Sequence, residues 1–232
     1  ADLTPSNNTF SSSSSTFSNE NPSGNHINYG VREFGMSAIM NGMVLHGGIK
    51  PYGATFLVFT DYARNAVRLS ALMGIPSIFV YTHDSVALGE DGPTHQPVEH
   101  MVTLRSTPNL NSWRPADLVE TAVAWNEAVK SKETPTCLIF SRQGTSAISR
   151  TEDQLSLINK GGYLIDESDN SDITLVASGS EVQLVIDAAK ELKNHSISSN
   201  VVSMPSLDIF LQQSEEFQSS IINPDKPILV VE

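Results

Sequence analysis

Histidine and carboxylate side chains gather in one short polar stretch of the chain, residues 83–97. The chemically versatile members of this stretch are His83, Asp84, Glu90, Asp91 and His95. The stretch follows an apolar run, residues 77–81, whose composition is typical of a buried strand. Ligands of open α/β sheets bind beyond the carboxyl ends of the strands, so we expect a polar loop in this position to carry chemistry.

These side chains suit several kinds of site. A metal site is the weaker interpretation, because their spacing matches neither a helical i, i+4 zinc pair nor a short Cys/His clamp. A nucleophilic hydrolase is weaker still, because no serine lies in a Gly-x-Ser-x-Gly elbow and the single cysteine, Cys137, lies inside an apolar run. Imidazoles and carboxylates can hydrogen-bond the hydroxyls of a polyol, and histidine moves protons near neutral pH. The residues alone therefore predict a site for a small polar ligand, phosphorylated or not.

The apolar pattern before this loop indicates how it is positioned. The elements expected in order are a helix over residues 32–45, a strand over 52–58, a helix over 61–73 and a strand over 77–81. Strand, helix and strand in this order predict a right-handed parallel βαβ unit. Glu33 then lies in the first turn of its helix, where an ordinary carboxylate is solvated and favoured by the helix dipole.

The α/β pattern continues to the end of the chain. Further helices are expected over residues 98–104 and from Pro115, and further strands over 136–140, 173–177, 200–203 and 228–231. The helix from Pro115 is expected to carry one apolar face formed by Leu118, Ala122, Trp125 and Val129. Ser180 and Gln183 fit a capping box for a helix after residue 179, and the polar segment 149–171 is predicted to be a linker. The expected fold class is α/β, with a parallel-sheet domain followed by a second α/β segment.

Composition bounds the partners and the compartment. The 232 residues carry a formal net charge of −12, whereas nucleic-acid binding needs a basic face. No apolar run approaches the roughly 18 residues of a membrane helix. One cysteine permits no internal disulfide, so we expect a buried thiol and a reducing, cytoplasmic compartment. We predict no nucleic-acid partner and no membrane partner.

The two ends and one polar segment carry further expectations. Residues 6–25 are dominated by Ser, Asn, Gly and Pro, which predicts a mobile surface loop. No charged and apolar leader follows Ala1, so we expect no signal peptide. The chain stops at Glu232 inside a strand-like run, and we expect both ends to belong to a longer protein.

Four segments taken together resemble the transketolase family. They are residues 1–7 (ADLTPSN), 26–36 (HINYGVREFGM), 55–65 (TFLVFTDYARN) and 89–97 (GEDGPTHQP). The resemblance extends over nearly the whole chain and is weakest over residues 9–24 and 144–171. Transketolases use thiamine diphosphate and a divalent cation, Mg²⁺ or Ca²⁺, to move a two-carbon ketol unit from a ketose phosphate to an aldose phosphate in the pentose phosphate pathway. The resemblance implies this activity and a three-layer pyrimidine-binding domain.

The resemblance also implies which residues hold the cofactor. Asp2 and Leu3 would lie near the thiazolium ring, and the pyrimidine would be surrounded by Glu33, Phe56, Phe59 and Tyr62. Glu33 would hydrogen-bond the aminopyrimidine, because a carboxylate there favours the imino tautomer that removes the thiazolium proton. Phe56 would stack on the pyrimidine ring, and the other two aromatic side chains would complete the pocket.

The remaining site residues are implied to contact the substrate. His83 and His95 would contact sugar oxygens and take part in proton transfers, so that they are catalytic together with Glu33. Asp91 would bind a hydroxyl of the donor. The terminal phosphate would be held by Ser6 and Arg142, whose guanidinium matches phosphate oxygens in a bidentate way.

One family motif does not occur in the sequence. Transketolases bind the diphosphate and the metal through an N-terminal Gly-Asp-Gly motif, and the nearest match here, residues 90–92, belongs to the substrate loop. The resemblance implies a homodimer whose active site lies at the subunit interface, so this chain is expected to supply the pyrimidine half and to be inactive alone. The implied limits are a pyrimidine-binding domain over residues 1–148, the linker over 149–171 and the start of a C-terminal domain over 172–232.

Two alternatives to a transketolase stay open at this point. Dihydroxyacetone synthase is a similar enzyme that differs in its donor and acceptor. A non-catalytic binding module could keep the fold, although Glu33, His83 and His95 are all intact.

Overall fold

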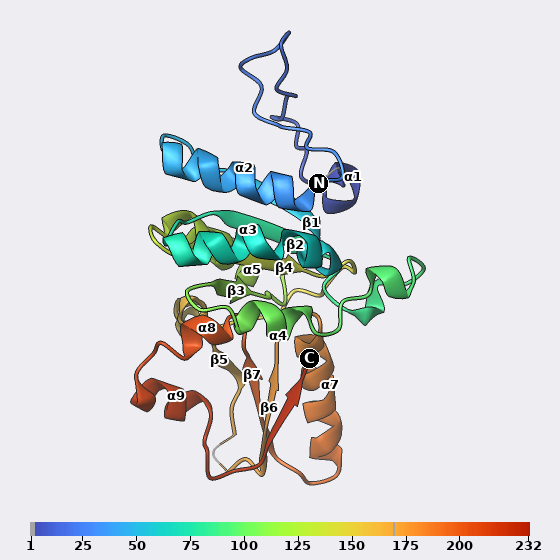
Figure 1. The fold of residues 1–232 in the computed structure, drawn as a ribbon. Helices are drawn as coiled ribbons and strands as arrows, with labels where there is room; N and C mark the ends of the chain where they lie inside the picture. Colours follow the sequence, from blue (N-terminus) through green and yellow to red (C-terminus); the bar gives the residue numbers. More distant parts are fainter. Residues whose placement is uncertain (1–2, 169) are drawn as a thin grey trace. The chain divides into compact units, whose positions relative to one another are not determined.

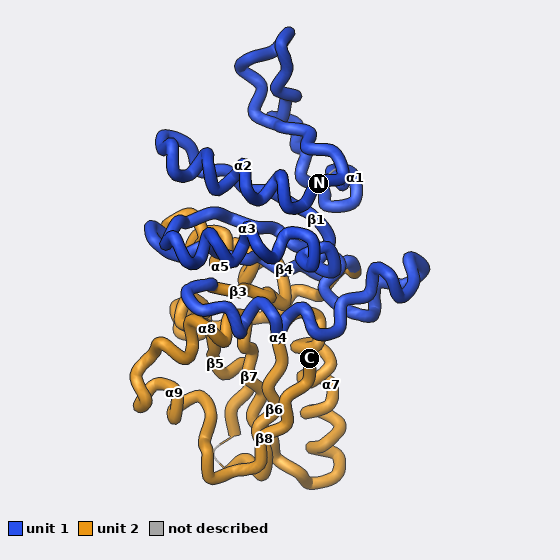
Figure 2. Tube along the Cα trace, viewed as in Figure 1, with its two compact units in different colours: residues 1–110, 131–142 blue, residues 111–130, 143–232 orange. Residues whose placement is uncertain are grey.

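The computed structural model describes residues 3–168 and 170–232, which form two compact units. Unit 1 comprises residues 1–110 and 131–142, and unit 2 comprises residues 111–130 and 143–232 (Figure 2). No helix of the described residues is long and apolar enough to cross a membrane. The limits expected for the two domains stay predictions.

Unit 1 is built around three parallel strands. Its strands and main helices are α2 (Glu33–His46), β1 (Tyr52–Phe56), α3 (Thr60–Met73), β2 (Ile78–Thr82), α4 (His100–Arg105) and β4 (Thr136–Phe140) (Figure 1). Its short helical turns are α1 (Thr4–Asn7), η1 (Leu57–Phe59), η2 (Val86–Leu88) and η3 (Pro93–His95). Strand β2 pairs in parallel with β1 on one side and with β4 on the other. The predicted parallel βαβ unit is confirmed.

The register of these strands aligns their carboxyl ends. Phe56 pairs with Thr82, and Thr82 pairs with Phe140. Strand β1 ends at Phe56 rather than at Val58, because the chain turns there into η1 although the residues remain apolar. The segments that follow the three strands therefore leave the sheet at one edge, where α/β proteins bind their ligands.

A hydrophobic cluster under the sheet holds these elements in place. Met36 and Met40 of α2 pack in this cluster with Val67 of α3 and Phe79 of β2. Cys137 of β4 belongs to the same cluster and is fully buried, as predicted. Burial of each large apolar side chain contributes about 1.5–3 kcal/mol.

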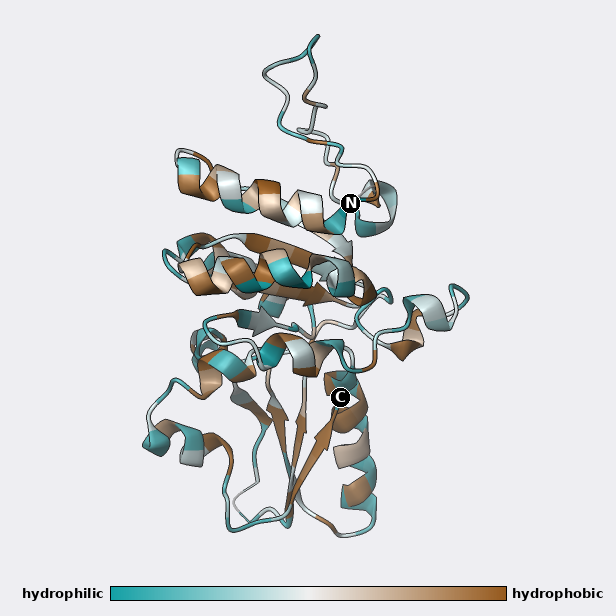
Figure 3. Ribbon diagram, in the orientation of Figure 1, coloured by the Kyte–Doolittle hydropathy of each residue, from teal (hydrophilic) through white to brown (hydrophobic). Residues whose placement is uncertain are grey.

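Unit 2 contains a second, mixed sheet. The helices and strands of unit 2 are β3 (Asn111–Trp113), α5 (Leu118–Lys130), α6 (Glu152–Leu157), η4 (Ile158–Lys160), β5 (Tyr163–Asp166), β6 (Ile173–Ala177), α7 (Glu181–Asn194), β7 (Ser199–Ser203), α8 (Leu207–Phe210), α9 (Glu215–Ile221) and β8 (Ile228–Val231). The strand order is β5-β7-β6-β8, in which only β5 is antiparallel to its neighbour. Figure 3 shows β6, β7 and β8 as mainly hydrophobic strands and α7 as a helix with both hydrophobic and hydrophilic residues. The α/β fold class is confirmed.

Three details of unit 2 differ from the sequence-based expectations. Residues 149–171, predicted to be a linker, contain α6, η4 and β5, and β5 pairs with β7. The capping box lies at Thr151 and Gln154, whose side chains bond each other's backbone N–H groups. Ser180 makes no such bond, because it already has helical backbone angles and its hydroxyl donates to Glu181.

Helix α5 also differs from its prediction. It begins at Leu118 rather than at Pro115. Leu118 and Val129 are exposed, and the buried side chains are Glu120, Ala124 and Ala128. The apolar periodicity predicted the wrong buried face of α5, because the buried face carries a charged residue.

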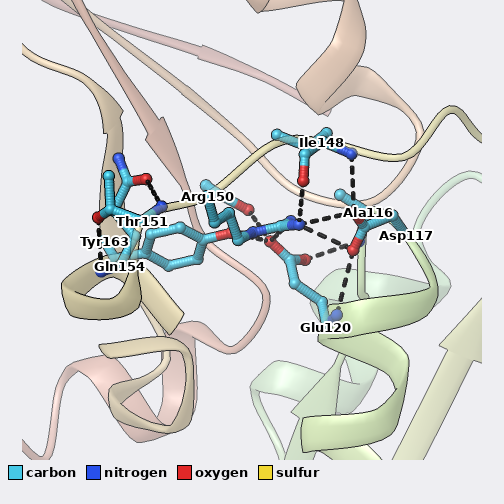
Figure 4. A network of polar contacts seen from close by, with 9 residues as sticks. Ala116, Asp117, Glu120, Ile148, Arg150, Thr151, Gln154 and Tyr163 are labelled. Carbon is cyan, nitrogen blue, oxygen red and sulfur yellow. Dashed lines mark hydrogen bonds and ion pairs between the residues drawn. The ribbon is translucent and has the colours of Figure 1, made fainter. Parts of the chain in front are cut away.

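The charge on Glu120 is compensated by a buried network (Figure 4). Its carboxylate accepts hydrogen bonds from the Tyr163 hydroxyl at 2.6 Å, from the Ser203 hydroxyl at 2.7 Å and from Arg150 Nη2 at 3.2 Å. The Arg150 guanidinium also donates to both carboxylate oxygens of Asp117, at 2.7 and 3.2 Å. Burial, and then the neighbouring Glu120 carboxylate, raise the pKa of Tyr163, so the phenol stays protonated and donates. The network joins α5, the segment before α6, and the second sheet.

Candidate functional site

The candidate site lies where β1 and β2 end in unit 1. His83 is the first residue after β2, and only 6% of its surface is exposed. Its backbone has a φ of +62°, in the left-handed region that side chains other than glycine rarely adopt. Its ring lies on Phe56, the last residue of β1, with 3.8 Å between ring centroids. Residues in such conformations cluster at functional sites, where the surrounding structure holds them.

An aromatic cluster extends from this pair and consists of Phe56, Phe59, Tyr62, His83 and His95. The Phe59 centroid lies 5.8 Å from that of Phe56 and 6.0 Å from that of Tyr62. The His95 ring meets Phe59 edge-on at 5.3 Å and Phe56 at 6.0 Å. Tyr62 is 66% exposed, so the cluster runs from the sheet edge to the surface. The structure brings both predicted histidines together with all three predicted aromatic side chains.

Burial and the charged residues of the site shift the pKa of His83. Burial is the main cause that lowers the pKa of His83. The Asp91 carboxylate opposes this shift, and the charges of Arg142 and His95 add to it. The net direction favours the neutral imidazole. Asp91 and Arg142 are exposed at this edge, Arg142 in the segment after β4.

A hydrogen-bonded chain behind His83 was not found from the sequence. Asn7 Nδ2 donates to Thr82 Oγ1 at 2.5 Å, and Thr82 Oγ1 lies 2.9 Å from His83 Nδ1. All three residues are buried. Thr82 directly precedes His83, but a side-chain contact between α1 and the end of β2 has no signal in a single sequence.

The remaining predicted residues lie in unit 1 with different surroundings. Glu33 is the first residue of α2, is 6% exposed, and its carboxylate has no hydrogen-bond or ion-pair partner among the described residues. Ser6 lies in α1 and is exposed, and Leu3 is the half-buried N-cap of the same helix. Asp2 lies outside the described residues. Because it has no partner among the described residues, the Glu33 carboxylate can accept a hydrogen bond from a ligand.

The donor set does not describe a metal site. Among the described residues, no group of three or more His, Cys, Asp or Glu side chains is arranged to hold a metal ion. What the site offers is imidazole, carboxylate, guanidinium and aromatic surface at one sheet edge. That combination is typical of α/β proteins that bind a small polar or anionic ligand.

Comparison with known proteins identifies the family. Residues 1–146 match the model of the transketolase pyrimidine-binding domain, and residues 161–232 match the transketolase-like C-terminal domain. The chain belongs to the transketolase family, which confirms the resemblance found from the sequence.

Individual relatives agree with this assignment. Transketolase 1 of Vibrio parahaemolyticus is 55% identical over 226 residues, which cover 97% of this chain and 34% of the relative. A Pichia stipitis transketolase in complex with sedoheptulose 7-phosphate is 46% identical, with a TM-score of 0.96 over 100% of this chain and 35% of that one. The transketolase of Leishmania mexicana gives 43% identity and a TM-score of 0.95, over 100% of this chain and 34% of its own. The chain thus spans about a third of the length of these relatives.

Proposed function

We propose that this chain is the pyrimidine-binding and substrate-recognising part of a transketolase, which transfers a two-carbon ketol unit between sugar phosphates. The observation that carries the proposal is the gathering of His83, His95, Asp91 and Arg142 around one sheet edge. These side chains offer donors, acceptors and a cation, which is what a phosphorylated polyol requires. Relatives with this fold include a protein solved with sedoheptulose 7-phosphate.

The residues fit thiamine diphosphate as the cofactor. Glu33 supplies a buried carboxylate that has no partner among the described residues and can hold the protonated ring nitrogen of an aminopyrimidine. Phe59 and Tyr62 supply aromatic surface for the same ring. His83 covers part of Phe56, so the pyrimidine would stack on what that ring leaves uncovered. When bound, the cofactor supplies the carbon nucleophile that accepts the ketol unit.

The substrate residues have separate tasks in this proposal. His83 in its neutral form donates a hydrogen bond to a sugar oxygen, and His95 exchanges protons with hydroxyls at the reacting carbons. Asp91 accepts from a hydroxyl of the donor sugar. Ser6 and Arg142 bind the terminal phosphate, where a guanidinium can make two parallel hydrogen bonds.

The remaining assignments concern partners outside this chain. We infer a homodimer in which a second subunit completes the site and Mg²⁺ or Ca²⁺ holds the diphosphate. The exposed apolar side chains on α3 support this inference, because a second subunit could cover them. They are Tyr62, Leu69, Leu72 and Met73. We infer a cytoplasmic location from the single buried cysteine.

A chimaeric enzyme tests this function. This chain would replace the matching 226 residues of the Vibrio parahaemolyticus transketolase 1. We expect the chimaera to form sedoheptulose 7-phosphate from a ketose phosphate donor and an aldose phosphate acceptor. A folded chimaera that uses formaldehyde as acceptor and ignores aldose phosphates would instead indicate a dihydroxyacetone synthase.

A further inference from the structure

We propose that Asn7 and Thr82 are positioning residues that hold His83 as the neutral tautomer protonated on Nε2. The imidazole would then offer an N–H donor to the ligand and keep Nδ1 as an internal acceptor. Only the identity of the ligand oxygen that receives this hydrogen bond rests on the proposed function.

The direction of the hydrogen bonds in this chain carries the inference. The amide nitrogen of Asn7 can only donate, and it lies 2.5 Å from Thr82 Oγ1. The Thr82 hydroxyl therefore accepts from Asn7 and has its own proton left to donate. The remaining neighbour of that hydroxyl is His83 Nδ1, at 2.9 Å. The hydroxyl oxygen could also accept from a protonated Nδ1, but its own proton would then have no acceptor among the described residues at this buried position. Nδ1 is therefore the unprotonated acceptor, which places the single proton of the neutral ring on Nε2.

Burial and packing help to hold His83 in this one tautomer. Asn7 and Thr82 are each 8% exposed, so water competes poorly for their hydrogen bonds. The Phe56 ring, 3.8 Å away, fixes the plane of the imidazole. Thr82 is the last residue of β2, and His83 follows it directly with a left-handed backbone.

The second histidine of the site provides a comparison within the same chain. Thr94 Oγ1 also lies 2.9 Å from Nδ1 of the following residue, His95. Thr94 is exposed, and no other hydrogen bond of its hydroxyl occurs among the described residues. That hydroxyl can rotate to donate or to accept, so it does not select a tautomer. The proposal therefore assigns a fixed tautomer to His83 and none to His95.

Long-range ¹H–¹⁵N correlation spectra of the histidine-labelled chain test the inference. We expect His83 to show a pyridine-like Nδ1 and a pyrrole-like Nε2, in a ratio shifted about fivefold relative to exposed His46. His83→Asn identifies the signals by their loss, because Asn tolerates the left-handed backbone.

Three variants and one control variant decide between the two tautomers of His83. Thr82→Val removes the hydroxyl and should return His83 toward the tautomer ratio of His46, whereas Thr82→Ser should keep the wild-type spectrum. Asn7→Asp should reverse the chain, because the new carboxylate accepts from Thr82 and forces Nδ1 to donate. Thr94→Val is the matched control and should leave the His83 signals unchanged.

Two results would overturn the proposal. One is a wild-type His83 protonated on Nδ1, which would mean that Thr82 donates to the amide oxygen of Asn7. The other is an unchanged His83 ratio in folded Thr82→Val, or in Asn7→Asp if Thr82→Val does not fold. The spectra need neither cofactor nor turnover, so failure here is distinct from absence of transketolase activity.

Discussion

At the scale of single residues, the site depends on burial of groups that would otherwise be charged or solvated. His83 shows this most clearly, because its ring is enclosed by Phe56 and Thr82 while Asp91 and Arg142 act on it from the surface. The sequence predicted that these residue types belong together. It could not predict the left-handed backbone of His83 or its contact with α1, since both depend on tertiary packing.

The lowered pKa of His83 predicts a pH dependence of stability. The folded state resists protonation while the unfolded chain binds a proton near pH 6.5, so the free energy of unfolding should fall as pH decreases below about 6.5. His83→Asn should remove this contribution and flatten the profile between about pH 7.5 and about pH 5.5. Urea denaturation at the two pH values measures the change, with exposed His46→Asn as the control. An identical pH profile for His83→Asn and the wild type would contradict the assignment.

At the scale of elements, residue pattern predicted most strands but not every helix. Strand β4 has the predicted limits, because a short apolar run between polar segments admits few alternatives. Helix α5 was placed too early and on the wrong face, because Glu120 is buried among hydrogen-bond donors far away in the sequence. A charged residue inside a core cannot be recognised from periodicity, which counts only apolar positions.

Two of the N-cap positions in unit 2 give a matched prediction. Thr151→Ala should lower the free energy of unfolding by about 1 kcal/mol, because it removes a capping box. Ser180→Ala should change it by a few tenths of a kcal/mol at most, because that hydroxyl bonds no backbone N–H group. Urea denaturation of both variants checks the difference. Equal losses would show that the hydroxyl of Thr151 does not stabilise α6 as a cap.

At the scale of the whole molecule, each unit has its own means of holding its elements. Unit 1 relies on an apolar cluster under parallel strands, whereas unit 2 adds the charged network of Asp117, Glu120 and Arg150. The apolar pattern predicted the α/β class correctly, and the resemblance to a known family predicted the family correctly. It did not indicate the network, whose members come from separate segments.

Removing the cation of the network should destabilise unit 2. Arg150→Met would leave two buried carboxylates uncompensated, which costs about 3–5 kcal/mol. Hydrogen exchange should show lost protection in β5 and β7 of unit 2. Arg64→Met, at an exposed position of α3, is the control and should cost less than about 0.5 kcal/mol. A loss of less than about 1 kcal/mol in Arg150→Met would show that the ion pairs of Arg150 do not stabilise the core of unit 2.

The chain alone is expected to bind thiamine diphosphate weakly even with Mg²⁺. Its sequence has no Gly-Asp-Gly motif, and the charged diphosphate supplies much of the anchoring energy. Isothermal titration calorimetry of the 232-residue chain checks this. Micromolar affinity would mean that the pyrimidine side of the site suffices.

The role of Glu33 in ketol transfer is the most direct test of the account. In the active chimaera with the Vibrio parahaemolyticus relative, Glu33→Gln keeps the shape of the side chain but removes its charge. We expect kcat to fall by about 10²-fold or more, the scale of general acid–base contributions. Glu20→Gln, at an exposed position, should keep the chimaera's full activity. Turnover by Glu33→Gln equal to that of the unmodified chimaera would contradict the assignment of this chain as the pyrimidine-binding part of a transketolase.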